Sequence, residues 1–173
     1  MIATVTLNPA VDKTYTSARM LPGQANRMDS VKSIAGGKGI NVAKVLRQYG
    51  YPVKTLGFLG GYTGKFIEDY LSKAGALCCF TPIEGSTRHT INILSQDGYV
   101  TELLEPGPDI SEKEQKQFLA DFELGIADCS LVILSGSAPE HIPAEIYFDL
   151  IMRARILGKK IILDSGGEYL KRS

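Results

Sequence analysis

The chain alternates short apolar strands with amphipathic helices, and this order limits the folds open to it more than any other feature. Leu131–Leu134 is apolar at every position, which is typical of a strand buried on both faces. Ile2–Leu7, Val53–Leu59 and Lys159–Leu163 are predicted as further strands, because they are rich in apolar and β-branched residues. Since parallel strands need a crossover, usually a helix, we expect a parallel sheet with helices packed on it.

The segments between these strands carry helix signals. In Ile40–Tyr49, apolar side chains recur at the i, i+3, i+4 and i+7 spacing of one helical face, and Gly50 follows as a C-terminal cap. Ser111 precedes Glu114 by three residues, the pattern of a capping box that opens a helix ending near residue 124. The remaining predictions are helices at Lys65–Ala74 and Pro143–Leu157 and a strand at Leu77–Ile83.

Two segments interrupt the alternation and contain only strand signals, at about 10–33 and 87–104. The first is mixed and polar around Pro22-Gly23, which predicts one or two exposed strands about a turn. In the second, Asp97-Gly98 lies between two β-rich stretches, a hairpin signal. We therefore expect an α/β fold in which these segments form a small sheet beside the main one.

Composition bounds the class of protein. The 173 residues suffice for one domain, and 19 basic residues balance 19 acidic ones. This balance argues against a nucleic-acid or membrane-surface partner, which would need excess positive charge. Residues 2–7 are too short and polar for a signal peptide or a membrane span. Cys78, Cys79 and Cys129 fit no zinc spacing, so we expect free thiols in a reducing cytoplasm.

Small and polar residues gather where four predicted strands end. In open parallel sheets, ligands bind at the carboxyl ends of the strands. Any one of these segments could be an ordinary polar loop, but the set of four favours a binding edge. The residues are Asn8 and Asp12, then Gly60 and Gly61, then Ser135-Gly136-Ser137, and finally Asp164-Ser165-Gly166-Gly167.

The strongest local signal is the run from Gly36 to Asn41, Gly-Gly-Lys-Gly-Ile-Asn, at the start of a predicted helix. Glycines let backbone N–H groups approach a ligand closely, a helix N-terminus favours anions, and Lys38 adds a positive charge. The spacing matches neither a Walker A loop nor a complete Rossmann fingerprint. Asn41 offers a donor and an acceptor to a sugar hydroxyl, unless it is simply a solvated helix residue.

Two arginines and two histidines have less specific contexts. Arg27 and Arg88 have the fork that binds phosphate through two hydrogen bonds, although an isolated exposed arginine is the more common case. His89 and His141 lack partners at metal-binding spacing, and we expect both to be structural or surface residues.

Together these motifs resemble the ribokinase-like (PfkB-type) carbohydrate kinases, in the branch of the 1-phosphofructokinases with the tagatose-6-phosphate kinases nearby. The matching segments follow the family order over essentially the whole chain, and the Gly-Gly-Lys-Gly-Ile-Asn run with the upstream Asn-Pro-x-x-Asp is specific. The segments are Thr6–Asp12, Gly23–Arg27, Ala35–Ala43, Gly57–Gly61, Thr87-Arg88, Glu105–Pro108, Ser135–Pro139 and Leu163–Gly167.

The resemblance implies a three-layer α/β core with a β-sheet lid over a sugar site. It also implies a homodimer paired through the lid. The residues that match the family's substrate site are Asp12 and Asn41 for the sugar hydroxyls, with the backbone of Gly36 and Gly37 close by, and Arg27, Lys38, Arg88 and Ser137 for the substrate phosphate and its surroundings.

Other family motifs have no counterpart in residues 1–173, which we therefore expect to be the N-terminal part of the fold. The family's Asn-x-x-Glu segment serves magnesium and phosphate binding, and its Gly-x-Gly-Asp motif supplies the general base. The base Asp is expected beyond Ser173, and Asp12 is expected to orient hydroxyls instead.

By resemblance, the parent protein would be an ATP- and Mg²⁺-dependent kinase that converts fructose 1-phosphate to fructose 1,6-bisphosphate, or a tagatose-6-phosphate kinase. The chain alone would be inactive, binding a sugar phosphate without turnover or being non-functional.

Overall fold

The main sheet is parallel, as predicted. The computed structural model describes all residues from 1 to 173. Five strands lie in the order β10-β9-β1-β4-β5, and the sixth, β6, also pairs with β4. Every pairing in this sheet is parallel, so all the strands end at one edge. The strands are β1 Ile2–Thr6, β4 Val53–Gly60, β5 Leu77–Cys78, β6 Thr81–Ile83, β9 Leu131–Ser135 and β10 Lys160–Asp164.

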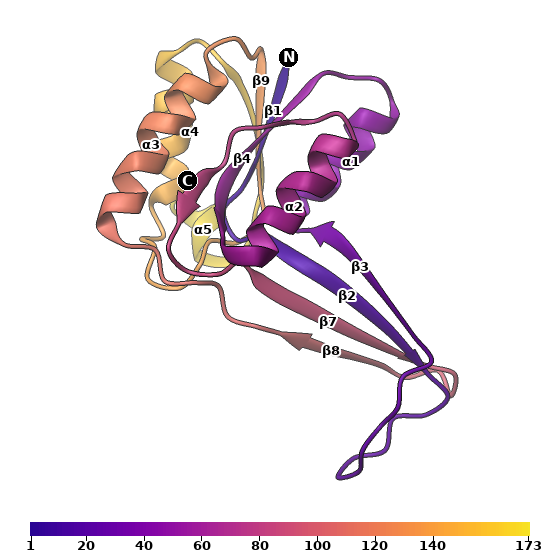
Figure 1. Cartoon of the computed structure of the whole chain (residues 1–173). Coiled ribbons are helices and arrows are strands. Elements are labelled where there is room, and N and C mark those ends of the chain that lie inside the picture. The colour runs from indigo at the N-terminus through magenta and orange to yellow at the C-terminus, as the bar shows by residue number, and fades with distance from the viewer.

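Helices cover both faces of this sheet and complete a three-layer α/β fold. Figure 1 shows α1 and α2 on one face and α3 and α4 on the other, with the short α5 beside the sheet. None of these helices is long and apolar enough to cross a membrane. The helices are α1 Lys38–Gln48, α2 Gly61–Lys73, α3 Glu112–Ile126, α4 Ile146–Ile156 and α5 Gly167–Lys171.

The larger hydrophobic core lies between the sheet and helices α3 and α4. Phe118 of α3 is fully buried, and its ring centroid lies 4.6 Å from that of Phe58 on β4. Tyr147 of α4 is also fully buried in this core. A smaller core under α1 and α2 includes Ile40 and Ile67. Burial of these side chains is the main favourable term in folding.

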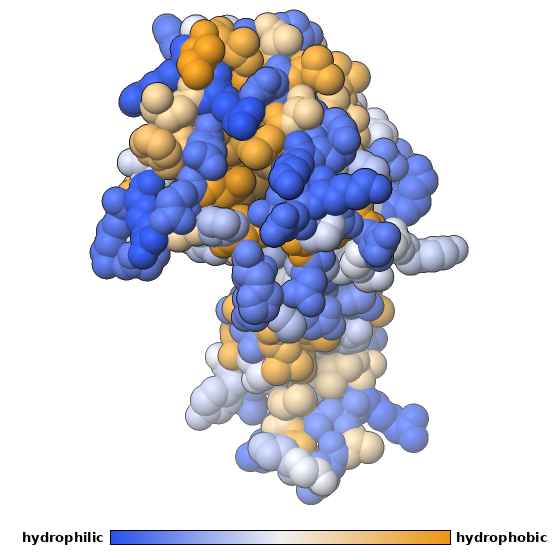
Figure 2. Space-filling model, turned by 90° about the vertical axis from the view of Figure 1, so that its left-hand side faces the viewer, coloured by the Kyte–Doolittle hydropathy of each residue, from blue (hydrophilic) through white to orange (hydrophobic).

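The two predicted β-only segments form a separate four-stranded sheet, the lid, in the order β3-β2-β7-β8. Its two central strands, β2 and β7, are parallel, and each pairs antiparallel with an edge strand. Figure 1 shows the lid extending away from the core, and Figure 2 shows it as a narrow projection below the rounded body. The strands are β2 Ala10–Ser17, β3 Ser30–Gly36, β7 Arg88–Ser95 and β8 Val100–Leu104.

Helix starts differ in how well the sequence predicts them. The capping box of α3 is confirmed, since the Ser111 hydroxyl accepts from the Glu114 N–H and the Glu114 carboxylate accepts from the Ser111 N–H. Helix α4 begins at Ile146 rather than Pro143, because the Ile146 N–H bonds to the Pro143 carbonyl and closes a tighter i, i+3 turn. Helix α2 begins at Gly61, four residues before the predicted Lys65.

The single strand predicted at Leu77–Ile83 is wrong. Two short strands, β5 and β6, pair with β4 on either side of a break. Gly57 of β4 lies opposite the break with a φ of 145°, a conformation outside the strand region. The ladder is therefore interrupted there, which no pattern within Leu77–Ile83 itself indicates.

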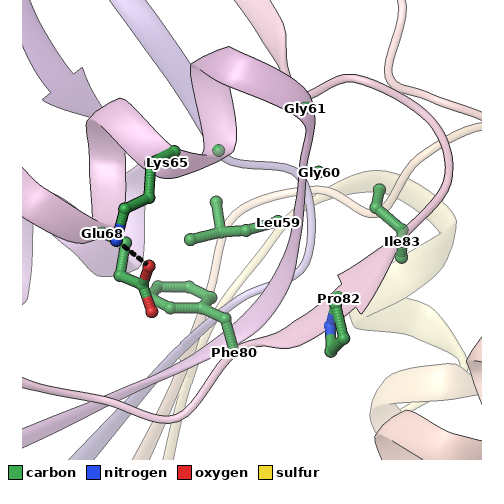
Figure 3. Close-up of a pocket in the computed structure, with 9 residues that line it drawn as sticks. Leu59, Gly60, Gly61, Lys65, Glu68, Phe80, Pro82 and Ile83 are labelled. Carbon is green, nitrogen blue, oxygen red and sulfur yellow. Dashed lines mark hydrogen bonds and ion pairs between the residues drawn. The ribbon is translucent and has the colours of Figure 1, made fainter.

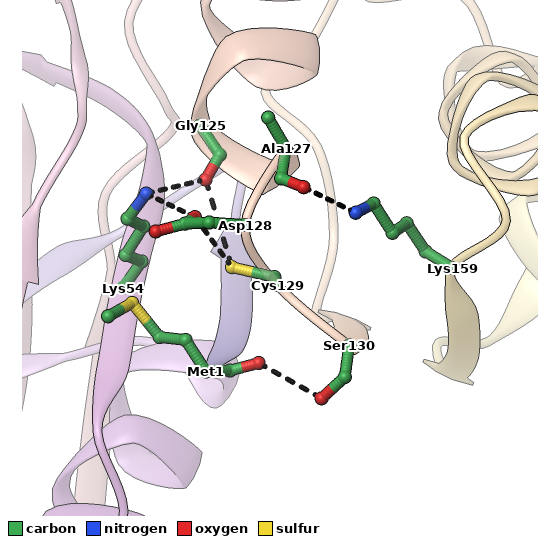
Figure 4. A network of polar contacts seen from close by, with 8 residues as sticks. All are labelled: Met1, Lys54, Gly125, Ala127, Asp128, Cys129, Ser130 and Lys159. Carbon is green, nitrogen blue, oxygen red and sulfur yellow. Dashed lines mark hydrogen bonds and ion pairs between the residues drawn. The ribbon is translucent and has the colours of Figure 1, made fainter.

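Polar groups at the amino ends of the strands pair with one another (Figure 4). Lys54 Nζ donates to the Gly125 carbonyl at 3.2 Å and to the Asp128 carboxylate at 2.6 Å. Lys159 Nζ donates to the Ala127 carbonyl at 2.6 Å. Helix α3 has no basic residue in its own last turn, so these lysines satisfy and stabilise its C-terminal carbonyls. This edge of the sheet is structural.

Substitution of Phe118 tests the larger core. Phe118→Ala is expected to lower the free energy of unfolding by about 3–5 kcal/mol, because it removes a buried aromatic ring and leaves a cavity. Urea denaturation followed by circular dichroism measures this change. Leu124→Ala is the control, since Leu124 lies on the same helix with 76% of its surface exposed. Equal losses in the two variants would contradict the described core.

Candidate functional site

A cavity of about 220 Å³ lies at the carboxyl edge of the sheet, between the lid and the N-terminus of α1. It brings together residues from β1, the lid, α1 and the loop after β9, which are far apart in the sequence. Six of the eight predicted binding residues line it: Asp12, Gly37, Lys38, Asn41, Arg88 and Ser137. Two further lining residues, Asn8 and Gly136, belong to the polar strand ends predicted as a binding edge, whereas Thr6, Ala10 and Thr90 were not singled out as site residues.

Gly36 does not line the cavity but lies against the carboxylate of Asp12, which does. A β-carbon at Gly36 would overlap the Asp12 carboxylate, so any larger residue there would displace that carboxylate. Thr90 of β7 lies opposite Asp12 in the lid register. Burial raises the pKa of Asp12, and the nearby charges of Lys44 and Arg88 partly oppose that shift. A carboxylate is thus held at the cavity wall with cations on both sides.

Lys44 supports this wall from α1. Its Nζ donates to the Ala35 carbonyl at 2.7 Å, which ties α1 to the end of β3 directly before Gly36. Burial lowers the pKa of Lys44, and the Asp12 carboxylate opposes that shift. This role was not predicted, because the helical pattern places Lys44 on α1 without indicating what it faces.

Arg88 supplies the main cationic group of the lid. Its Nη1 donates to the Glu105 carbonyl at 3.0 Å. Burial lowers the pKa of its guanidinium, and the negative charges of Asp12 and Glu105 oppose that shift. The Glu105 carboxylate in turn accepts from the His89 N–H at 2.7 Å, which ties the segment after β8 to the start of β7. One nitrogen of the Arg88 guanidinium, Nη1, is thus held by the Glu105 carbonyl, whereas Nε has no partner in the protein.

Two buried polar atoms at this site have no hydrogen-bond partner in the protein: Asn8 Oδ1 and Arg88 Nε. A third such atom, Ser95 Oγ, lies at the far end of β7. Buried polar atoms are nearly always paired, so an unpaired cluster needs an explanation. At the amino edge of the sheet the polar groups satisfy one another, whereas these two atoms have no partner within the protein.

The N-terminus of α1 adds backbone donors. Its first turn contains Lys38 and Asn41, both exposed, and no acidic residue. The N-cap is Gly37, so no side chain caps the free N–H groups. Those groups and the helix dipole favour a negatively charged ligand, and the Lys38 ammonium adds to that preference.

Arg27 lies outside this cavity. It is exposed in the loop between β2 and β3, and Figure 1 shows that this loop forms the tip of the lid. Asn26 holds this loop in shape, because its side chain accepts from the Leu21 N–H at 2.7 Å and donates to the Leu21 and Gln24 carbonyls. The lid therefore keeps Arg27 away from the cavity of its own chain.

A second cavity of about 240 Å³ lies beside α2 (Figure 3). Its cation, Lys65, is paired with Glu68 and Asp69, each at 3.0 Å. Leu59 and Phe80 form part of the remaining wall. Gly60 and Gly61 of the predicted binding edge line this cavity, but none of the eight residues predicted to bind the substrate does, and the charge of Lys65 is already matched. It is the weaker candidate for a polar ligand.

The residues of this chain form no metal centre on their own. No group of three or more His, Cys, Asp or Glu side chains is placed to hold a metal ion. The cavity has one carboxylate, Asp12, which is flanked by cations. The described site therefore suits the recognition of an anionic polar ligand.

The raised pKa of Asp12 makes a stability prediction. The folded protein binds this proton more tightly than the unfolded chain, so stability falls as the pH rises above 3.8, the ordinary value. Asp12→Asn is therefore expected to have the higher free energy of unfolding at pH 7, with the difference closing below pH 3.8. Chemical denaturation across this pH range measures it. Asp29→Asn, an exposed lid-loop control, should show no such gap; a matching gap would contradict the assignment.

Comparison with known proteins identifies the family and the fold. Residues 3–172 match the family model described as pfkB family carbohydrate kinase. A structure from Thermotoga maritima, described as a possible 1-phosphofructokinase, is 30% identical with a TM-score of 0.91. Phosphofructokinase-2 from Escherichia coli, solved in complex with fructose-6-phosphate, is 27% identical with a TM-score of 0.91.

The matches cover this chain far more completely than they cover the relatives. The alignments take in 99% of this chain but 55% of the Thermotoga maritima chain and 56% of the Escherichia coli chain. The chain thus spans about half the length of these solved structures, and the matched half includes the lid and the cavity. On the family match and the shared fold, this chain belongs to the pfkB family of carbohydrate kinases.

Proposed function

We propose that this chain is the sugar-phosphate-binding part of an ATP- and Mg²⁺-dependent kinase, and that its ligand is fructose 1-phosphate. The observation that carries this proposal is the convergence, in one cavity, of hydroxyl-binding groups with cations and unpaired buried atoms. In ordinary polar loops the polar groups would hydrogen-bond to one another instead, as the residues at the opposite edge of the sheet do.

Each part of the cavity has a role in this proposal. Asp12 and Asn41 hold sugar hydroxyls, because a carboxylate accepts and an amide both donates and accepts. Lys38, Arg88 and Ser137 contact the phosphate, beside the uncapped N-terminus of α1. The cavity volume of about 220 Å³ is below the ~300–1,000 Å³ of drug-sized ligand sites, which suits a single sugar better than a nucleotide.

Tagatose 6-phosphate is the alternative ligand. It presents a phosphate and hydroxyls on a similar ketose frame, so the same donors and cations would serve it. Fructose 6-phosphate enters the comparison because the Escherichia coli relative was solved with it. Relative affinities for the three sugar phosphates decide among them.

We propose that the chain alone binds without transferring phosphate. Asp12 is the only acidic residue that lines the cavity, and in this proposal it orients the sugar hydroxyls. No second carboxylate is therefore present to act as general base on the accepting hydroxyl. The parent protein would supply that base, ATP and magnesium through segments that correspond to the rest of the relatives' length. We place it in the cytoplasm, because all three cysteines are free thiols.

We also propose that two copies pair through their lids. Tyr15 pairs with Val31 in the lid register, on the face opposite Asp12, and Leu103 of β8 lies on the same face. Val31 is 58% exposed and Leu103 is 49% exposed, so this face carries uncovered apolar surface. The ordered loop at the lid tip would then present Arg27 to the second copy, which accounts for its distance from the cavity of its own chain.

Arg88→Ala tests the ligand proposal. Wild-type chain is expected to bind fructose 1-phosphate, and the variant to bind it about 10- to 100-fold more weakly, because charge-assisted hydrogen bonds are lost. Isothermal titration calorimetry measures both affinities. Arg19→Ala is the matched control, since the Arg19 side chain is 72% exposed near the lid tip.

Four results would count against the proposed function. Absence of binding, or equal binding by Arg88→Ala, contradicts the assigned site. Tighter binding of tagatose 6-phosphate than of fructose 1-phosphate favours the alternative ligand. Formation of a sugar bisphosphate by the purified chain with ATP and Mg²⁺ contradicts binding without turnover.

Val31→Asp tests the lid pairing. The wild-type chain is expected to sediment as a dimer and the variant as a monomer, because a charge would be buried between two apolar faces. Val100→Asp is the control, since Val100 is 65% exposed on the opposite lid face and should leave the dimer intact. Sedimentation velocity distinguishes the species, and a wild-type monomer would contradict the pairing.

A further inference from the structure

The backbone carbonyl of Gly136, in the loop after β9, is held by two hydroxyl groups. Tyr147 of α4 donates its Oη–H to this oxygen at 3.1 Å, and Ser165 donates its Oγ–H at 2.9 Å. The Gly136 N–H donates to the Asp164 carbonyl at 3.0 Å. Both lone pairs of the carbonyl are therefore occupied, and the loop is fixed from β10 and α4.

Tyr147 is an unusual donor, because its side chain lies in the apolar core. It is fully buried, and its ring packs edge-on against Tyr169 with centroids 5.8 Å apart. Burial raises the pKa of Tyr147, so the hydroxyl stays protonated and can only donate to this oxygen. A buried tyrosine hydroxyl needs a hydrogen-bond partner, which a phenylalanine in the same place would not. Here the partner is the Gly136 carbonyl, in the peptide beside the cavity.

The direction of this carbonyl fixes the direction of the next N–H group. No peptide bond in the chain is cis, and in a planar trans peptide the C=O and the N–H point in opposite directions. The Ser137 N–H therefore points away from Tyr147 and Ser165. Gly136 and Ser137 both line the cavity, and a β-carbon at Gly136 would lie 3.7 Å from the Lys38 β-carbon.

The Ser137 N–H has no acceptor within the protein. It lies outside the helices and strands, and it makes none of the loop, turn or side-chain hydrogen bonds of the chain. A backbone donor that is fixed in direction and left unpaired beside a lysine suits an anionic oxygen.

We propose that Tyr147 and Ser165 are positioning residues, which aim the Ser137 N–H at an anionic oxygen of the bound sugar phosphate next to Lys38. This inference rests on the proposed function, since it names a further donor of the same site. The hydroxyls of Tyr147 and Ser165 then contribute to the affinity for the ligand without contacting it, because they fix the orientation of the Gly136–Ser137 peptide before binding. Ser137 acts through its backbone as well as through its side chain.

Tyr147→Phe tests this proposal, because it removes the hydroxyl and keeps the ring. In calorimetry with fructose 1-phosphate, the variant is expected to bind about tenfold more weakly than wild type, as for loss of one charge-assisted hydrogen bond. Tyr169→Phe is the matched control, since the two rings pack together and the Tyr169 hydroxyl makes no hydrogen bond in the structure. It should bind like wild type.

Nuclear magnetic resonance supplies a readout that general destabilisation would not reproduce. In the wild-type chain, fructose 1-phosphate should move the Ser137 amide proton downfield, and in Tyr147→Phe this shift should shrink. Without ligand, the Gly136 carbonyl carbon should move upfield in Tyr147→Phe and stay in place in Tyr169→Phe. An unchanged Gly136 carbonyl resonance would overturn the positioning role whether or not ligand binds.

The two proposals fail in different ways. If Arg88→Ala weakens binding while Tyr147→Phe binds like wild type, the positioning role is wrong and the proposed function stands. If the wild-type chain binds no sugar phosphate, the proposed function is wrong, and the ligand role of the Ser137 N–H is wrong with it.

Discussion

The close approach of α1 to the end of β1 is the constraint on which the rest of the site depends. A β-carbon at Gly39 would lie 2.6 Å from the Val5 carbonyl, and one at Gly37 would lie 2.8 Å from the Thr6 methyl. Neither position has room for a side chain, and the two glycines therefore allow the helix to begin directly above the strand end. Its uncapped N–H groups, Lys38 and Asn41 then face the cavity that the lid closes from the other side.

The two edges of the main sheet use polar groups in different ways. At the amino edge, lysines cap the last carbonyls of α3, and this pairing stabilises the fold. At the carboxyl edge, a buried amide oxygen and a guanidinium nitrogen remain unpaired, which costs stability. In the proposed function, a ligand that pairs them recovers that cost on binding. Sites of this kind commonly trade stability for function, and the raised pKa of Asp12 has the same origin.

Sequence reasoning found the parts of the site that local motifs encode. The glycine-rich run predicts the start of α1 and the candidate binding residues Lys38 and Asn41, and the motif series predicts Asp12 and Arg88. Thr90 and Tyr147 were missed, because they depend on the register of β2 with β7 and on the packing of α4. The break between β5 and β6 depends on Gly57 of a neighbouring strand. Contacts between distant segments carry no signal within either segment.

The proposed function places a sugar phosphate at the carboxyl edge of this sheet, between the lid and α1. A crystal structure of the chain with fructose 1-phosphate tests this placement. The sugar is expected beside Asp12 and Asn41, with its phosphate within hydrogen-bond distance of Arg88 and the Ser137 N–H. A ligand bound instead in the cavity beside Lys65, or an empty site at saturating ligand, would contradict it.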